Sequence, residues 1–379
     1  MKILHISKFF PPIYGGIENQ VKSICDYVFF KNSEVEVLAF GKKTNIRRNK
    51  YKIFEFKPFL KIFSQPLSIS YILCGRKLIN KSGIVHYHYP NIVGLILCFL
   101  YVKNKNLYFH WHSDILNQHY LNFFFSFIEK NLLKKSKKII FTSSYYAKKF
   151  KYYHLFKNKI KIINCGSDNL NLQFKRNISA RKNYFKIKEK FKSNKIIYSI
   201  GRLVPYKGFK YLILSSKFLQ NNYKIIIAGN GGDYNYLKQL IDENNLNKKV
   251  FLLGKVSHSE HLSYLKLCDV FCLPSISKNE AFGIALIEAM SFAKPLISTK
   301  IEGSGVNFVN KNNITGLKAP IKNPKKLSSL IIKIMQKKKI YKKFSLNSKK
   351  RYQQYFTSNL MNKNFYRMYK SDYEYIKCK

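Results

Sequence analysis

The sequence predicts an α/β protein of two domains, each built on a parallel sheet covered by helices. Short apolar runs with strand character alternate with segments of helical periodicity along the chain. A chain of 379 residues is also too long for one comfortable hydrophobic core. The alternation is interrupted between Cys165 and Lys195, where periodicity is lost and Lys and Asn are frequent. We therefore expect domains at residues 1–170 and 190–354.

The first domain opens with a predicted strand, a glycine turn and a helix. The strand covers Lys2–Ser7, the turn contains Gly15 and Gly16, and the helix covers Ile17–Phe30. This order is the opening unit of a Rossmann-like domain, in which the glycine turn lets the backbone approach a ligand at the helix start. Further strands are predicted at Glu34–Phe40, Tyr51–Phe56, Ile84–His88, Asn106–His110 and Lys138–Thr142, and helices at Leu67–Lys81, Ile92–Val102, Ile115–Leu133 and Ser144–Tyr153.

The second domain repeats this alternation from Lys195 onward. The loop from Gly229 to Asp233 lacks a full G-x-G-x-x-G, and we interpret it as a turn. The chain contains no G-x-x-x-x-G-K-[ST], which disfavours an ordinary P-loop NTPase. Strands are predicted at residues 195–200, 223–228, 250–253, 269–275 and 293–298, with a helix at 283–292 and a helical, aromatic tail from 352 to 379.

The charge balance is strongly basic, with 69 Lys and Arg against 19 Asp and Glu and a net charge of +50. Three interpretations compete: binding to nucleic acid, attraction to an anionic membrane, and a genome that favours lysine codons. The basic residues are spread along the whole chain, and no nucleic-acid-binding motif is present. We therefore keep a basic nucleic-acid-binding protein as the alternative from a different class, and expect no nucleic acid partner.

Cysteine usage and hydropathy indicate a protein without disulfides or membrane spans. The seven cysteines are scattered and form no C-x-x-C pair, which favours reduced thiols over a disulfide framework or a zinc knuckle. The chain begins with a predicted strand rather than a signal peptide. Its longest apolar run, Ile92–Val102, is too short to span a bilayer. We expect a soluble or peripheral protein.

Two carboxylates flank a predicted helix start in the second domain. Glu280 lies in the loop after one strand, where open α/β sheets bind ligands, and Glu288 lies within the helix that follows. The backbone amides of Phe282, Gly283 and Ile284 are donors that a phosphate or a sugar oxygen can accept from. Carboxylates beside a row of amide donors suit a nucleotide sugar, which has hydroxyls at both ends and negative charge between them. The alternative is a solvated loop acid and a surface helix acid, but an unpaired carboxylate is costly in so apolar a helix.

The spacing from Glu280 to Glu288, with Phe282-Gly283 between, resembles the carboxylate motif of retaining glycosyltransferases of the two-Rossmann-domain (GT-B) type. It is most similar to bacterial family 4, and the run Ile301–Val306 and Thr315-Gly316-Leu317 also match that group. The resemblance implies two Rossmann-like domains whose sheets face each other across a cleft. It also implies that the last helix, residues 355–379, crosses back to the first domain.

A basic loop follows the first strand of the second domain. Arg202 and Lys207 lie five residues apart, with glycines at 201 and 208. Two cations opposite a row of helix-start amides suit a pyrophosphate whose charge grows as it leaves. The pattern G-R-L-x-x-x-K-G is similar to the phosphate-binding loop of the family. We therefore expect Arg202, Lys207 and Glu280 to be catalytic, and Gly15 and Gly16 to contact the donor together with Glu288 and the amide row.

Two H-x-H pairs occur in the first domain, one at His86 and His88 and one at His110 and His112. They raise a metal hypothesis, but no carboxylate or cysteine completes a ligand set at a recognisable spacing, so we expect no metal site and no cofactor. His-Ser-Asp at 112–114 is similar to the active-site histidine run of the family. That resemblance implies that His112 is a catalytic residue that hydrogen-bonds the sugar or the acceptor. Asp114 either binds acceptor hydroxyls or caps the following helix, and capping is favoured.

The stretch from Leu121 to Lys138 combines aromatic residues with lysines and suits a helix on a membrane surface. A core helix with a solvated basic end explains it equally well. If it meets a membrane, the headgroups are expected to face Lys130, Lys134, Lys135, Lys137 and Lys138.

The resemblance implies an enzyme that transfers a hexosyl unit from a nucleotide sugar to a lipid-linked or saccharide acceptor in surface polysaccharide synthesis. It further implies retention of anomeric configuration without a metal. The match at His112 and at the Gly303 run favours GDP-mannose as the donor, with a UDP-hexose or UDP-N-acetylhexosamine as the alternative. The expected location is cytoplasmic, at the inner face of the cytoplasmic membrane, where the partners would be an anionic membrane surface and the acceptor.

Overall fold

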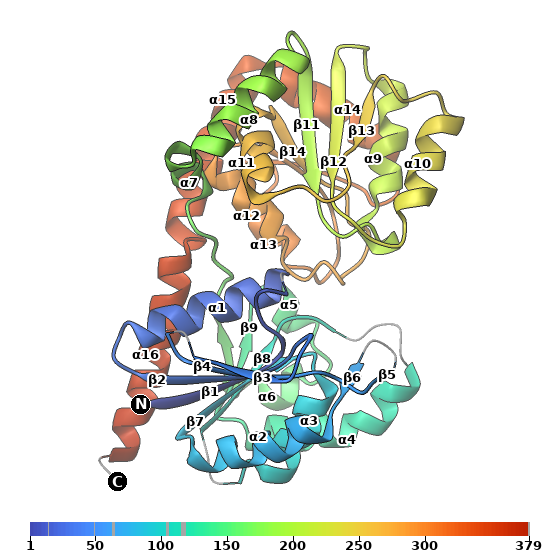
Figure 1. Ribbon diagram of the computed structural model, residues 1–379. Helices are drawn as coiled ribbons and strands as arrows, with labels where there is room; N and C mark the ends of the chain where they lie inside the picture. The colour runs from blue at the N-terminus through green and yellow to red at the C-terminus, as the bar shows by residue number, and fades with distance from the viewer. Residues whose placement is uncertain (14, 49, 63–64, 104–105, 115–118, 378–379) are drawn as a thin grey trace. The chain divides into compact units, whose positions relative to one another are not determined.

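The chain folds into two compact units in a computed structural model that describes residues 1–13, 15–48, 50–62, 65–103, 106–114 and 119–377 (Figure 1). Unit 1 comprises Met1–Cys165 and Ser358–Lys379, and unit 2 comprises Gly166–Thr357. The chain thus leaves unit 1 to build unit 2 and returns for its last helix.

Unit 1 is built on an eight-stranded sheet in the order β10-β9-β8-β7-β1-β2-β4-β3. All neighbouring strands pair in parallel except β3 and β4, which form an antiparallel edge. A separate two-stranded hairpin is formed by β5 and β6. The strands are β1 (Lys2–Phe9), β2 (Glu34–Phe40), β3 (Asn45–Arg48), β4 (Lys52–Phe56), β5 (Leu60–Ile62), β6 (Gln65–Leu67), β7 (Ile84–Tyr89), β8 (Asn106–Trp111), β9 (Lys138–Phe141) and β10 (Ile160–Ile162).

Helices cover both faces of this sheet, and the last helix of the chain lies alongside the first (Figure 1). Their shared core includes Val21 and Ile24 of the first helix with Phe365 and Tyr369 of the last, all fully buried. The helices are α1 (Gly16–Phe29), α2 (Ile69–Lys81), α3 (Ile92–Tyr101), α4 (His119–Lys135), α5 (Ser144–Lys148), α6 (Tyr153–Phe156) and α16 (Ser358–Lys377), with a 3₁₀ turn η1 (Lys157–Lys159).

Unit 2 is built on a six-stranded, fully parallel sheet in the order β13-β12-β11-β14-β15-β16. The strands are β11 (Lys195–Ile200), β12 (Tyr223–Ala228), β13 (Val250–Leu252), β14 (Val270–Leu273), β15 (Leu296–Thr299) and β16 (Gly316–Ala319). The helices are α7 (Leu170–Arg176), α8 (Ile178–Lys190), α9 (Phe209–Ser215), α10 (Tyr234–Glu243), α11 (His258–Leu267), α12 (Ile284–Ser291), α13 (Val306–Val309), α14 (Pro324–Gln336) and α15 (Lys338–Tyr355), with 3₁₀ turns η2 (Pro205–Lys207) and η3 (Ser216–Phe218).

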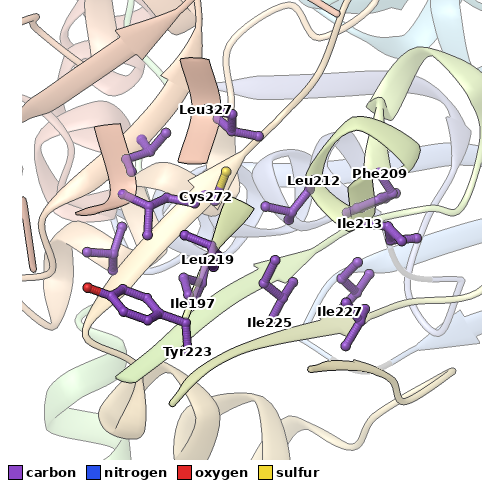
Figure 2. Close-up of a cluster of buried hydrophobic side chains, with 14 of the residues drawn as sticks. Ile197, Phe209, Leu212, Ile213, Leu219, Tyr223, Ile225, Ile227, Cys272 and Leu327 are labelled. Carbon is purple, nitrogen blue, oxygen red and sulfur yellow. The ribbon is translucent and has the colours of Figure 1, made fainter. Parts of the chain in front are cut away.

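Branched apolar side chains on one face of the unit 2 sheet form its core (Figure 2). Ile197 of β11 and Ile225 and Ile227 of β12 alternate along their strands and pack against Leu212 of α9 and Leu327 of α14. This alternation follows from the period of two in a strand, which brings every second residue to the same face. The core holds the sheet rigid, so the loops that leave its strands start from fixed positions.

The α/β class with parallel sheets in two domains is confirmed, and several predicted elements differ in detail. The stretch from 165 to 195, predicted to lack periodicity, contains α7 and α8 within unit 2. The last helix, predicted at 355–379, is observed as α16, and the first residues of the predicted helical tail, from 352, belong to the end of α15. The helix predicted at 144–153 ends at Lys148. Among the described residues, no helix is both long and apolar enough to cross a membrane.

Candidate active site

The strand order of unit 2 places a ligand-binding position between β11 and β14. The sheet runs outward from β11 through β12 and β13 on one side, and through β14, β15 and β16 on the other. Open α/β sheets bind ligands at this reversal, beside the carboxyl ends of the strands. The loop with Arg202 and Lys207 follows β11, and the loop with Glu280 follows β14, so both predicted loops lie at this position.

Glycines bring the loops at this edge into direct backbone contact. Gly208 has a φ of +67°, and a Cβ there would lie 2.3 Å from the carbonyl oxygen of Pro274, so only glycine fits. The amide of Ile276 donates to the carbonyl of Tyr206 at 2.8 Å. Gly229, with a φ of +141°, packs in the same way against the carbonyl of Gly201. The predicted turn at 229–233 therefore braces the basic loop.

Lys207 and Glu280 form an ion pair at the reversal point. Lys207 Nζ donates to Glu280 Oε2 at 2.6 Å, and the two side chains are 14% and 10% exposed. Ser275 Oγ donates to the same carboxylate oxygen at 3.0 Å. Burial by itself lowers the pKa of Lys207, but the charge of Glu280 and the neighbouring Tyr206 raise it, and the net shift is upward. The lysine is therefore fully charged at neutral pH.

A second set of hydrogen bonds ties the Glu280 loop to the run at 301–306. Ser304 Oγ donates to the carbonyl oxygen of Glu280, and Gly305 N donates to the carbonyl of Ala281 at 2.8 Å. Gly283, with a φ of +83°, then turns the chain into α12. Phe282, Gly283 and Ile284 come at the start of this helix, where backbone amides lack intrahelical acceptors. This row of donors begins next to the ion pair.

Glu288, on α12, contacts a histidine of α11 rather than standing unpaired in its apolar helix. Its Oε2 lies 3.4 Å from His261 Nε2, and the other ring nitrogen of His261 contacts the hydroxyl of Tyr198 at 3.0 Å. The Glu288 side chain remains 26% exposed. The buried His261 therefore fixes the orientation of the Glu288 carboxylate, part of which stays accessible to solvent.

Arg202 differs from Lys207 in being exposed. Its guanidinium reaches the hydroxyl of Tyr206 at 3.5 Å. The structure thus brings Lys207, Glu280 and the helix start together and leaves Arg202 as a solvent-facing cation on the same loop.

In unit 1, the predicted glycine turn lies at the start of α1. Gly15 is the residue before the helix and has an extended conformation that any residue can adopt. A Cβ on Gly15 would lie 2.3 Å from Glu18 Oε2, and Gly16 is the first residue of the helix. The carboxylate of Glu18 therefore occupies part of the space beside this helix start. The assignment of Gly15 and Gly16 to the donor stays a prediction.

His112 follows β8 and is buried rather than presented on an open loop. Its side chain is 5% exposed and stacks on His110 with ring centroids 3.7 Å apart. His112 Nε2 contacts His88 Nδ1 at 3.0 Å. Burial lowers the pKa of His112 to about 3, so its imidazole is neutral at physiological pH. A neutral imidazole can donate through one nitrogen and accept through the other.

Asp114 accepts a hydrogen bond from the indole nitrogen of Trp111 at 2.9 Å. The next helix, α4, is described from His119 onward, so the predicted capping role falls on a stretch that lies outside the described residues.

Sequence reasoning missed the residues that position the predicted ones. Ser275, Ser304 and His261 hold Glu280 and Glu288, yet each is a common residue type in an unremarkable local pattern. Only Ser304 carried a signal, because it lies within the run at 301–306 that resembles the family.

Comparison with known proteins agrees with this geometry. Residues 14–169 match the family model for Glycosyltransferase Family 4, and residues 180–351 match that for glycosyl transferases group 1. The chain is 30% identical over 363 residues to a glycosyltransferase of Methanocaldococcus jannaschii, covering 92% of each chain. It is 23% identical to the O-antigen chain mannosyltransferase C of Escherichia coli, covering 95% of this chain and 96% of the relative.

The fold is shared with solved structures as well. HepE of Anabaena, crystallised in complex with UDP, superimposes with a TM-score of 0.78 at 18% identity, covering 98% of this chain and 100% of that one. Two family models that together span both units, and a relative at 30% identity over nearly the whole chain, identify this chain as a glycosyltransferase of family 4, with the GT-B fold.

Proposed function

We propose that this enzyme transfers a hexosyl unit from a nucleotide sugar to a lipid-linked or saccharide acceptor, with retention of anomeric configuration. The observation that carries the proposal is the Lys207–Glu280 pair at the strand-order reversal of unit 2, beside the amide row that opens α12. A cation, a carboxylate and backbone donors in one place suit a sugar diphosphate, whose phosphates need positive charge and whose hydroxyls need acceptors.

Each residue has a distinct role in this proposal. Lys207 and Arg202 neutralise the charge that develops on the departing nucleoside diphosphate, and the amides of 282–284 bind its oxygens. Glu288 accepts hydrogen bonds from the ribose hydroxyls, and Glu280 contacts the sugar. We assign His112 to the sugar or the acceptor through the resemblance, with its neutral imidazole as a hydrogen-bonding group. No metal ion is assigned to the diphosphate, because the two cations fill that role.

For the donor we propose GDP-mannose. Support comes from the E. coli relative, which is named for mannosyl transfer to the O-antigen chain and matches nearly the full length of this one. By the same likeness we place the reaction in O-antigen or related polysaccharide synthesis. A UDP-hexose or UDP-N-acetylhexosamine is the competing donor.

A thermal-shift panel tests the donor. The panel contains GDP, UDP, their mannose, glucose and N-acetylglucosamine conjugates, and a short DNA duplex. A ligand at 100 times its Kd stabilises the folded state by about 2.7 kcal/mol, which is readily seen as a rise in Tm. We expect GDP and GDP-mannose to raise the Tm and DNA to leave it unchanged. A rise in Tm with UDP compounds alone would show that the donor is a UDP-sugar rather than GDP-mannose. A rise in Tm with DNA alone would contradict the proposed substrate class.

The stereochemical proposal is tested on the product, and the metal proposal is tested by the dependence of activity on added cations. NMR of the product with the matching acceptor is expected to show the same anomeric configuration as the donor. Activity is expected to be independent of added Mg²⁺ or Mn²⁺. If EDTA abolishes turnover and either cation restores it, a metal rather than Lys207 and Arg202 carries the diphosphate charge.

We further propose that unit 1 meets the anionic inner face of the cytoplasmic membrane through the exposed end of α4. Phe127 is 67% exposed there, and Lys130, Lys134 and Lys135 are exposed on the same helix. Each lysine near an anionic leaflet contributes about 1 kcal/mol of attraction. The proposal uses three of the five predicted lysines, because Lys137 pairs with Asp372 at 3.2 Å and Lys138 belongs to β9. The side chains of Phe123 and Phe124 lie outside the described ones.

Co-sedimentation with vesicles tests this surface. We expect binding to vesicles of anionic lipid at low salt, no binding to neutral vesicles, and loss of binding when Lys130, Lys134 and Lys135 are changed to Gln. Lys342, Lys343 and Lys349, exposed on α15, provide a control with the same loss of charge. Equal binding of both variants would show that net charge rather than α4 drives association, and binding to neutral vesicles would contradict an electrostatic mode.

A further inference from the structure

Five buried histidines gather on one face of the unit 1 sheet. They come from three adjacent strands, and the face is the one that α16 covers. His5 on β1 is directly opposite His86 on β7, and His88 is opposite His110 on β8. His112 follows at the end of β8, and all five side chains are at most 5% exposed. The cluster lies where the strand order of unit 1 reverses, between β1 and β7, and four of its five histidines lie within the strands rather than beyond their carboxyl ends.

The ring nitrogens of this cluster are only partly satisfied. His88 uses both of its nitrogens, since Nε2 lies 3.1 Å from His5 Nδ1 and Nδ1 lies 3.0 Å from His112 Nε2. Four other buried nitrogens have no partner among the described residues: His5 Nε2, His86 Nε2, and both nitrogens of His110. Each buried polar atom left unpaired costs about 1–3 kcal/mol. Of these four nitrogens, His86 Nε2 is the one that a species bound by His5, His86 and His88 would satisfy.

We propose that His5, His86 and His88 bind a divalent transition-metal ion of the zinc class. One nitrogen from each of the three rings lies within 4.8 Å of those of the other two. The 3.1 Å between His5 Nδ1 and His88 Nε2 is close to the spacing of about 3.3 Å for two nitrogens on one tetrahedral zinc with Zn–N bonds of about 2.0–2.1 Å.

The chemistry of the three ligands selects the ion. Imidazole suits Zn²⁺, Cu²⁺, Ni²⁺ and Co²⁺, whereas Mg²⁺ and Ca²⁺ require oxygen ligands. Burial lowers the pKa of His5 to about 3, so its lone pair is free for a metal at neutral pH. Three imidazoles leave a fourth tetrahedral position, which water fills in sites of this kind. The sequence did not predict this set, because His5 belongs to no H-x-H pair and joins the other two only in the folded sheet.

Tyr369 of α16 supports the ligand set from behind. Its hydroxyl lies in hydrogen-bond contact with His86 Nδ1, which leaves the unpaired Nε2 of His86 as the ligand atom. Metal-binding histidines are commonly oriented by such a contact on their second nitrogen. Phe365, one turn earlier on α16, packs against the same ring. The orientation of His86 is therefore set before any ion arrives.

The ion would also fix the tautomer of His112. A metal on His88 Nε2 keeps the proton of that ring on Nδ1, from which it donates to His112 Nε2 at the observed 3.0 Å. His112 then carries its own proton on Nδ1. Only this consequence rests on the role proposed above for His112, because the metal site itself stands on the geometry of His5, His86 and His88.

Metal content and cobalt absorption test the site without reference to activity. The untagged protein, produced with Zn²⁺ and dialysed, is expected to retain about one zinc per chain by elemental analysis. Refolded with Co²⁺ instead, it is expected to show the visible d–d bands of a tetrahedral nitrogen site. The variant with both His5→Gln and His86→Gln is expected to lose the ion, while His154→Gln, an exposed histidine of the same unit, retains it.

A milder variant covers the case in which the double variant fails to fold. Tyr369→Phe keeps all three ligands and removes only the hydroxyl on His86, so zinc affinity is expected to fall by about 10–100-fold. Tyr366→Phe, on the same helix, is the matched control and is expected to bind normally.

Three results would overturn the proposal. The first is wild-type protein that retains no metal and whose Tm does not rise with added Zn²⁺. The second is a folded double variant that keeps its ion. The third is an ion lost in His112→Gln but kept in His5→Gln, which would place it on His88, His110 and His112 instead. These tests measure the ion and not the transferase activity. A failure of the proposed function can therefore be distinguished from a failure of the metal-site proposal.

Discussion

Both sheets reverse their strand order beside their first strand, but the two units place different polar groups near that reversal. In unit 2, Lys207 and Glu280 carry opposite charges and satisfy each other, with Ser275 completing the contact. In unit 1, the strands beside the reversal carry a row of neutral, buried histidines, several of whose nitrogens have no partner among the described residues. The reversal occurs in both units, but in unit 2 charged side chains lie in the loops beyond it, and in unit 1 imidazoles lie mainly on the strands beside it.

The two arrangements respond to different perturbations. A buried ion pair loses stability when one partner is removed, because the remaining charge is left uncompensated. A neutral imidazole cluster loses stability when protons are added, because burial disfavours the charged form. Substitution should therefore have its largest effect in unit 2, and acid should have its largest effect in unit 1.

The largest expected effect is on turnover, from the cations of unit 2. Lys207→Ala and Arg202→Ala are each expected to lower kcat by on the order of 10²–10³, with a smaller change in KM, because the diphosphate charge develops chiefly in the transition state. Steady-state kinetics measures both constants. The Arg202 variant is easier to interpret than the Lys207 variant, because Arg202 is exposed and its removal leaves no buried carboxylate without a partner.

Lys210→Ala, a lysine of the adjacent helix α9, controls for general loss of charge and should leave kcat unchanged. A rise in KM at constant kcat in the Arg202 variant would reduce that residue to a ground-state binding group.

The second prediction concerns acid and unit 1. The pKa of His5 and of His112 is about 3 in the folded protein, against an ordinary value of about 6.5. Protons therefore bind the unfolded chain more tightly. Stability is intact above pH 6.5 and is lost as pH falls toward 3, by roughly 1.4 kcal/mol per pH unit for each such histidine in metal-free protein.

The single tryptophan makes this measurable in one unit. Trp111 is buried in unit 1, so urea unfolding followed by its fluorescence reports that unit, while hydrogen exchange in β11 and β12 reports unit 2. With a chelator present, the fluorescence midpoint should fall between pH 7.5 and 5 more steeply than protection in unit 2. Equal acid sensitivity of both units would remove the contrast between them.

The third prediction sharpens the role of unit 2 in donor binding. Glu288→Ala is expected to weaken binding of the nucleoside diphosphate by roughly 10–100-fold, which corresponds to the loss of hydrogen bonds to a charged group worth about 1.5–3 kcal/mol. Calorimetric titration measures the affinity. Glu243→Ala, an exposed acid of α10, should bind normally. An unchanged affinity in folded Glu288→Ala protein would refute the ribose assignment.

The smallest expected effect comes from the residue behind that carboxylate. His261→Phe removes the nitrogen that contacts Glu288 and is expected to weaken donor binding a few-fold, by about 0.5–1.5 kcal/mol. His261→Gln, which retains a donor, should recover much of the affinity. If both variants weaken binding equally and lower the Tm equally, His261 serves packing rather than the position of Glu288.

Local patterns predicted much of the fold because the sheets are buried and regular. The strands Glu34–Phe40, Lys195–Ile200 and Tyr223–Ala228 were predicted to the residue, since each is a clear apolar run bounded by turn residues. The short hairpin of β5 and β6 was missed, because β5 is wholly exposed and shows no alternation. Helix α8 was missed because its lysine-rich sequence buries only Ala180.

The candidate site was predictable by residue type but not by contact. The motif around Glu280 and the loop with Lys207 were both visible in the sequence, yet the two residues are 73 positions apart and only the parallel sheet brings them together. The histidine cluster shows the same limit. H-x-H pairs mark one face of a strand, but which strands are neighbours is a property of the topology, so His5 carried no signal of its own.

The position of α16 has a consequence for synthesis on the ribosome. The core of unit 1 includes Phe365 and Tyr369, and Asp372 pairs with Lys137 and contacts the Tyr108 hydroxyl, so these buried contacts depend on the last stretch of the chain. Chains emerge from the ribosome with the N-terminus first, and domains usually fold in that order. Here the N-terminal unit remains without α16 until after unit 2 has been synthesised. A chain truncated shortly after Thr357 would keep all of unit 2 and leave the apolar face of α1 uncovered, as a target for chaperones and proteases.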